Sequence, residues 1–249
     1  MKKFTKRSLI ALIAGLILLI AGVSSFALSA SGLLFESEYK AEFYMNHLQI
    51  HLTENGKDVC GGKNTLDGKS KTVGTLAGYL NGNIEPGKAY REEIAARNKQ
   101  DIPVYARITV RKYWLKKDGK TKATDLSPDM IKLTYEGEEY NTSAWKENPD
   151  ERTSESRTYY YLSQIPASGD SEQLFNRLSI DSAVLDDVTE NSTEKDGVTT
   201  YTYTYKYDGY TFMIEADVQA IQTHNANDAI KSQWGIYNVT ENGGSLSVN

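Results

Sequence analysis

The sequence predicts an all-β fold: a jelly-roll-like antiparallel β-sandwich with one or two short helices. Three observations lead to this prediction: period-two alternation in several runs, turn residues between these runs, and few helical patterns. The composition is ordinary for a globular protein, with 39% hydrophobic and 24% charged residues. We therefore expect a single extracellular sandwich domain over residues 31–249, preceded by an N-terminal hydrophobic segment over residues 1–30.

The N-terminus has the pattern of an export signal. A basic stretch, Lys2–Arg7, precedes the apolar run Leu9–Val23, and small residues follow at Ala27, Ser29 and Ala30. Basic residues hold their end of such a segment in the cytoplasm, so the rest of the chain is expected outside the cell. Two outcomes stay open. Residues 1–30 are either a signal peptide cleaved during export or a retained membrane anchor, since the apolar run approaches the ~20 residues that span a bilayer.

Charge and cysteine content exclude several classes of protein. The chain has 28 Lys and Arg against 33 Asp and Glu; four of the basic residues lie in the N-terminal segment, which leaves 24 against 33, or −9, for the rest. An acidic protein without a basic cluster outside its leader is not expected to bind nucleic acid. The single cysteine, Cys60, excludes an intrachain disulfide framework.

Short strands separated by turn residues are expected over most of residues 31–249. In Ile102–Trp114 the apolar residues alternate with Tyr, Arg and Thr, and Pro103 stands only at the start. This pattern is typical of a half-buried strand. Further strands are expected at Tyr44–Leu52, Tyr90–Asn98, Met130–Tyr135 and Thr158–Leu162.

The strongest local pattern is a hairpin. Alternating residues from Tyr201 to Val218 flank the pair Asp208-Gly209, which favours a two-residue type I′ turn. Such a turn would place Tyr205 opposite Phe212 on an aromatic face. We expect this hairpin to be part of the core, and a platform of tyrosines for a carbohydrate or another ligand is the alternative.

Helical patterns are few. Gln173–Leu178 is expected to form one or two turns, and Asn227 to cap a short helix in which Ile230 and Trp234 share a face. Three polar segments are expected to be loops: Glu54–Val73, Asn141–Ser156 around Trp145, and Asp186–Gly197.

No catalytic, metal or cofactor site is predicted. His47 and His51 are four residues apart, but they lack both an adjoining Glu and a third ligand. His224 stands alone in a polar stretch, and Cys60 is expected to be an incidental free thiol rather than a reactive thiol or a dimer contact. Glycosylation sequons begin at Asn141, Asn191 and Asn238.

Several separated segments carry a family resemblance. They are the Lys-rich leader, Glu85-Pro-Gly87 before a strand, Arg97–Arg107, Tyr159–Leu162 followed by Ile165–Phe175, and Ala216–Gln222 leading to Trp234-Gly235. Their order, over nearly the whole chain, resembles the TasA/camelysin family of bacterial biofilm-matrix proteins, which are exported through an alternate (SipW-type) signal peptidase. The resemblance implies a jelly-roll sandwich that assembles into fibres, in which a strand of one subunit completes the sheet of the next.

Strand donation of this kind would use the segment after the leader, Ser31–Leu52. The assembly residues expected in this donor strand are Leu33, Leu34, Phe35, Tyr39, Phe43 and Leu48. The expected partners are further copies of the chain or related matrix subunits, and a signal peptidase during export. If residues 1–30 are not cleaved, they are also expected to bind the membrane.

We therefore expect a non-enzymatic structural protein of the extracellular biofilm matrix, secreted or at the cell surface, that self-assembles by edge-strand donation. The alternative is a membrane-tethered extracellular binding or adhesion module, which retention of the leader and exposure of the tyrosines would favour. A secreted hydrolase ranks lowest, because no catalytic set can be assembled from the sequence.

Overall fold

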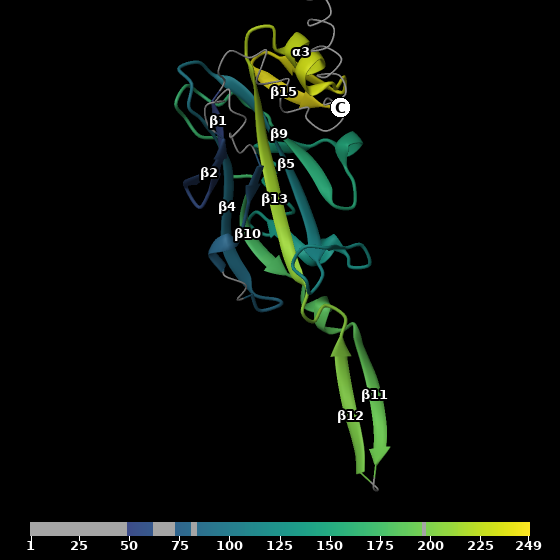
Figure 1. Ribbon diagram of the computed structural model, residues 1–249. Coiled ribbons are helices and arrows are strands. Elements are labelled where there is room, and N and C mark those ends of the chain that lie inside the picture. The colour runs from purple at the N-terminus through teal and green to yellow at the C-terminus, as the bar shows by residue number, and fades with distance from the viewer. Residues whose placement is uncertain (1–48, 62–72, 81–83, 196–197) are drawn as a thin grey trace, which may run out of the picture. The chain divides into compact units, whose positions relative to one another are not determined.

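Antiparallel strands dominate residues 49–61, 73–80, 84–195 and 198–249, which are the residues that the computed structural model describes (Figure 1). All of them belong to one unit, His47–Asn249. The first large sheet has the order β2-β1-β4-β10-β7. Its strands are β1 (Ile50–Glu54), β2 (Lys57–Gly61), β4 (Ala89–Asn98), β7 (Ile131–Thr134) and β10 (Phe175–Ile180).

The second large sheet has the order β3-β13-β5-β9-β8, with β6 paired to β5. Its strands are β3 (Val73–Thr75), β5 (Val104–Leu115), β6 (Lys122–Ala123), β8 (Trp145–Glu147), β9 (Ser156–Tyr161) and β13 (Thr211–Gln222). Two separate hairpins complete the strands. They are formed by β11 (Val188–Lys195) with β12 (Val198–Tyr205), and by β14 (Val239–Asn242) with β15 (Ser245–Val248).

The two large sheets share one hydrophobic core. Leu52 and Ile94 of the first sheet and Ile108 of the second are fully buried in the same cluster. Tyr159 of β9 also packs edge-on against Phe175 of β10, with ring centroids 5.4 Å apart, and so joins the sheets directly. The predicted all-β, sandwich-like fold is confirmed.

The predicted strand over Ile102–Trp114 is confirmed as β5, but the expectation of a half-buried strand is wrong for its first half. Tyr105 and Ala106 point to opposite faces, and both are 0% exposed. The second face is covered by the C-terminal segment: the Arg107 guanidinium lies 5.1 Å from the ring centroid of Trp234. Arg107 also donates to the Tyr160 hydroxyl at 2.9 Å.

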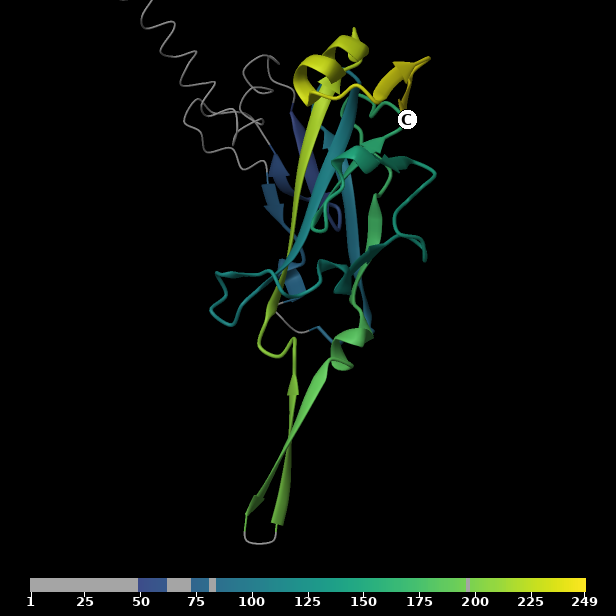
Figure 2. The same ribbon diagram turned by 90° about the vertical axis from the view of Figure 1, so that its right-hand side faces the viewer.

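The C-terminal segment contains the described α-helix. Helix α3 (Ala226–Ala229) continues into the π turn η5 (Ile230–Trp234), so the short helix expected here is present, and Ile230 and Trp234 are both buried. Figure 2 shows this segment and β14–β15 at the C-terminal end of β13. The predicted cap is wrong: the Asn227 amide instead bonds both backbone groups of Glu241, at 2.7 and 3.0 Å.

Short 3₁₀ helices and turns connect the remaining strands. The helices are η1 (Gly78–Leu80), η2 (Pro128–Met130), η3 (Pro149–Glu151) and η4 (Ser182–Leu185). Before β4, Gly87 adopts a positive φ of 81°, and its amide donates to the Ile180 carbonyl at 2.7 Å. No helix among the described residues is long and apolar enough to cross a bilayer, and the expected signal or anchor helix over residues 1–30 lies outside those residues.

The predicted helix at Gln173–Leu178 is wrong. Its apolar residues Leu174, Phe175 and Leu178 fit a helical stripe, but they lie in or next to β10 and are buried between the sheets. β10 pairs with β4 on one side and β7 on the other, so tertiary pairing overrides the local pattern.

The predicted hairpin across Asp208-Gly209 is also wrong. β12 pairs with β11, whereas β13 pairs with β5 along its whole length.

Each of the three segments expected to be loops contains a strand. Glu54–Val73 includes β2, Asn141–Ser156 includes β8 with a fully buried Trp145, and Asp186–Gly197 includes β11.

Candidate functional site

The β11–β12 hairpin presents its side chains to solvent. All eight residues of each strand are exposed, and both views show the hairpin extending past the ends of the large sheets (Figures 1 and 2). Thr and Tyr favour extended backbone, and Lys195 pairs with Val198 across the positions of Asp196 and Gly197. This second Asp-Gly pair is the sequence signal that could have located the hairpin.

One face of the hairpin carries tyrosines. Alternation places Tyr201, Tyr203 and Tyr205 together, and they are 57%, 56% and 45% exposed. Their cross-strand partners on that face are Ser192, Glu190 and Val188. The expectation that these tyrosines form core is therefore wrong.

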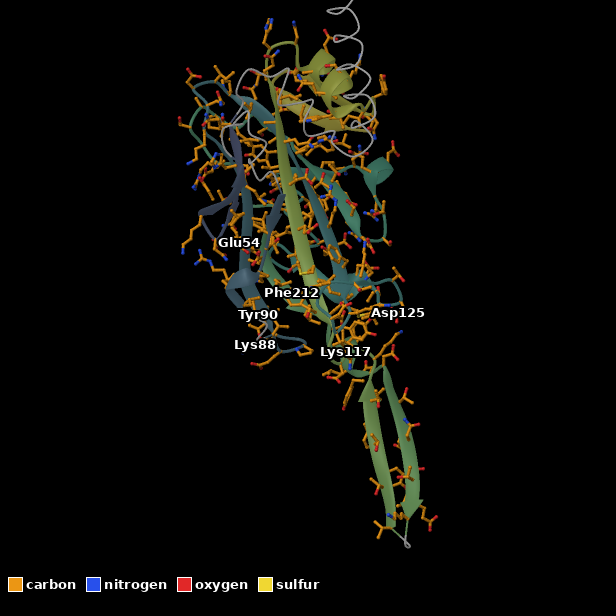
Figure 3. The ribbon with its side chains drawn as sticks, in the orientation of Figure 1. Glu54, Lys88, Tyr90, Lys117, Asp125 and Phe212 are labelled. Carbon is orange, nitrogen blue, oxygen red and sulfur yellow. The ribbon has the colours of Figure 1, made fainter. Side chains whose placement is uncertain are left out.

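An aromatic pocket of about 350 Å³ lies at the base of the hairpin. Trp114 of β5 is buried there, with ring centroids 5.1 Å from Tyr207 and 6.3 Å from Phe212. Figure 3 shows Phe212 and Lys117 close to the start of the hairpin. Tyr205 also lines the pocket. Because Tyr205 shares a face with the other two hairpin tyrosines, the exposed rings continue from the pocket along β12.

The surroundings of this pocket are acidic. Residues 186–208 contain six Asp and Glu against two Lys. The Asp208 carboxylate at the pocket lies 3.6 Å from the Lys117 ammonium group, and Asp187 pairs with Lys206 at 2.9 Å. The Asp187 carboxylate raises the pKa of Lys206. The local field therefore favours neutral or cationic ligands over anionic ones.

A second surface is the outer edge of β13. β5 pairs with all twelve residues of this strand, but β3 pairs only with Glu215–Asp217. Among the described residues no strand pairs with Val218–Gln222 on that side. The Leu76 amide donates to the Ile214 carbonyl at 2.9 Å, so alternation directs the backbone groups of Ala220 to the same edge.

Glu92 of β4 is a buried carboxyl group close to the partly exposed Glu54 of β1. Glu92 is 0% exposed, and neither of its carboxyl oxygens has a well-aligned hydrogen bond to a described residue. Burial, together with the nearby carboxyl of Glu54, raises the pKa of Glu92 to about 9. Burial and Glu92 also raise the pKa of Tyr79. Glu54 accepts a hydrogen bond from the Ala77 amide at 2.6 Å. Glu92 is thus a neutral acid at pH 7, and nothing in the sequence pattern marked it.

His51, one of the histidines singled out in the sequence, contacts an acidic side chain. His51 Nδ1 lies within hydrogen-bond distance of Asp58 Oδ2, at 3.0 Å, and His47 lies outside the described residues. No group of three His, Cys, Asp or Glu side chains in the described part of the chain could hold a metal ion. Cys60 belongs to β2.

The predicted donor segment lies almost wholly outside the described residues, including Leu33, Leu34, Phe35, Tyr39, Phe43 and Leu48. Its described end, Ile50–Leu52, is not free for donation. These residues belong to β1 and pair with β4 of the same chain, and Leu52 is 0% exposed.

Comparison with known proteins finds no family model, no curated protein and no solved structure that matches this chain. The tyrosine face with its pocket, and the edge of β13, are therefore the features from which function is inferred.

Proposed function

We propose that this is a structural protein of an extracellular biofilm matrix, secreted or held at the cell surface, which assembles with its own copies or with related matrix subunits. The edge of β13 is the observation that supports this proposal. A long strand whose Val218–Gln222 end has no paired strand on one side, among residues 49–61, 73–80, 84–195 and 198–249, is a template onto which another strand can add. Main-chain hydrogen bonds would supply the affinity.

The sequence supports the jelly-roll arrangement, the place among matrix proteins and the export that this proposal includes. The order of the segments that resemble the TasA/camelysin family supports a jelly-roll arrangement of the sandwich and a place among these matrix proteins. The basic and apolar leader supports export by a signal peptidase, with residues 1–30 either cleaved or kept as an anchor. No enzymatic activity, cofactor or nucleic-acid partner is part of this function.

The donor strand is proposed to lie in residues 31–48, since β1 begins at Ile50. Its apolar anchors would be Leu33, Leu34, Phe35, Tyr39, Phe43 and Leu48. An acceptor edge in one copy and a donor in the next make a head-to-tail contact, which generates open filaments when it does not close into a ring.

Light scattering and negative-stain imaging of the full chain over a range of concentrations test this proposal. We expect filaments, and we expect them to disappear when residues 31–48 are deleted. Ala220→Pro should also abolish them, because it removes an amide on the free edge and leaves the pairing with β5 intact. Circular dichroism checks that both variants are folded. A full chain that stays monomeric at every concentration would overturn assembly.

A second candidate function is a membrane-tethered binding or adhesion module. The exposure of Tyr201, Tyr203 and Tyr205 favours it, since large side chains gathered on a solvent-exposed face mark interaction surfaces. Binding of the full chain to polysaccharides and to host cells tests this function, with a variant in which Thr189–Thr204 is replaced by a short Gly-Ser turn. Equal binding by the two chains would refute a role for the hairpin.

A further inference from the structure

We propose that the aromatic pocket and the tyrosine face of β12 form one continuous binding site for a neutral polysaccharide chain. This inference rests on the second function proposed above, because it names the ligand of the same hairpin. The pocket of about 350 Å³ falls within the range of small-molecule sites. It would hold one sugar unit, and the exposed tyrosines would hold the units that follow.

The length of the tyrosine face favours an oligosaccharide over a single sugar as the ligand. Strand residues rise by about 3.3 Å each, so Tyr201 and Tyr205 stand roughly 13 Å apart along β12. Tyr205 lines the pocket, and Tyr203 lies between it and Tyr201 on the same face. A ligand that contacts all three rings and the pocket must therefore be an oligomer.

The chemistry of the surface suits a sugar ring. A pyranose has an apolar face of C–H groups and a rim of hydroxyls, and aromatic side chains offer an apolar face with a polar tip. On the tyrosine face of the hairpin, five of the eight residues are Thr, Ser or Tyr, namely Ser192, Thr199, Tyr201, Tyr203 and Tyr205. Their hydroxyls both donate and accept hydrogen bonds, as sugar hydroxyls do.

The charge of the surface around the pocket favours a neutral polysaccharide over an anionic one. Residues 186–208 have six acidic and two basic side chains, and the Lys117 ammonium group near the pocket is paired with Asp208. A uronate, phosphate or sulfate polymer would approach a surface of its own sign, and the described residues that line the pocket include no Lys or Arg to bind it.

Composition also argues against a protein partner. The cores of protein interfaces are depleted in charged residues and Ser, and Ser and Thr rarely make large energetic contributions there. The tyrosine face instead places Glu190 and Ser192 directly opposite Tyr203 and Tyr201. A ligand rich in hydroxyls satisfies these neighbours, whereas an apolar protein surface would leave them without hydrogen bonds.

Titration of the full chain with cellohexaose, laminarihexaose and chitohexaose tests the site. Calorimetry measures affinity, and Trp114 on the pocket wall gives a fluorescence signal. We expect at least one hexaose to bind and to change this fluorescence. Tyr203→Ala and Tyr205→Ala should each weaken binding about tenfold, whereas Tyr203→Phe, which keeps the ring, should retain most of the affinity.

Two matched controls are available. Tyr237 is 77% exposed and lies between η5 and β14, so Tyr237→Ala removes an exposed ring elsewhere. Thr202→Ala alters the opposite face of β12. Both should bind like the wild type.

The inference is overturned if no neutral hexaose binds at millimolar concentration, if polygalacturonate binds more tightly, or if the two Tyr→Ala variants bind like the controls. If the full chain binds host cells through the hairpin but binds no hexaose, the proposed binding module is supported and its neutral glycan ligand is refuted. If the full chain binds neither host cells nor a hexaose, both the binding module and its glycan ligand are refuted.

Discussion

Replacing Glu92 with Gln is expected to remove a pH dependence from the stability of the sandwich. In the folded protein the pKa of Glu92 is raised from 4.5 to about 9, so between these values the folded state binds one more proton than the unfolded state. Stability is therefore fully present below about pH 4.5 and is lost as pH rises towards 9. The loss amounts to about 3 kcal/mol between pH 5.5 and 7.5.

Urea unfolding of the wild type and Glu92→Gln at pH 5.5 and pH 7.5 measures this effect. Gln resembles the protonated acid and can donate to Glu54, so the variant should gain about 3 kcal/mol relative to the wild type over this interval. Glu93→Gln is the matched control. Glu93 is on the same strand but pairs with Arg91 at 2.7 Å, which lowers the pKa of Glu93. If Glu92→Gln and the wild type change equally with pH, the buried neutral acid is refuted.

Three further variants test the packing. Arg107→Met should lower the free energy of unfolding by about 3 kcal/mol in urea, because it leaves Glu151, 3.2 Å from the guanidinium, without its cation; no change would contradict this pairing. Trp145→Phe should cost about 2 kcal/mol in the same assay by removing the hydrogen bond from the indole to the Glu172 carbonyl, and a neutral effect would refute the role of that bond. Tyr203→Ala should change stability by less than about 0.5 kcal/mol in thermal unfolding, since the side chain is exposed; a large loss would mean that the hairpin packs on the sandwich.

Local alternation was sufficient to locate several strands. Tyr90–Asn98 corresponds to β4, and Met130–Tyr135 and Thr158–Leu162 overlap β7 and β9. Ile131 and Leu133 of β7, and Ile94 and Ala96 of β4, lie at every second position and are buried, and this period is a property of the segment itself. In β9 the three consecutive residues Tyr159, Tyr160 and Tyr161 are all buried, so there the aromatic, β-favouring composition marks the strand. Strand β10 was not predicted, because the spacing of its apolar residues fits both the helical period and the strand period. Only its pairing with the two neighbouring strands, β4 and β7, decides for a strand.

The choice of strand partner could not be predicted locally. Two Asp-Gly pairs flank β12, at 196–197 and 208–209, and each favours a tight turn. In the structure β12 pairs with β11. β13, which follows the second Asp-Gly pair, pairs instead with β5 along twelve residues. The long ladder with β5 lies in the core and outweighs a local hairpin, so the tyrosines of β12 are exposed instead of buried.

The sequence by itself determined an acidic chain, an all-β fold and a leader with the pattern of an export signal, since composition and short-range periodicity carry these properties. The tertiary structure decided that Tyr203 is exposed, that Glu92 is buried and that no described strand pairs with Val218–Gln222 on one side of β13. Each of these depends on which distant segment packs against the residue. Burial and pairing are properties of contacts between segments, and no single segment encodes them.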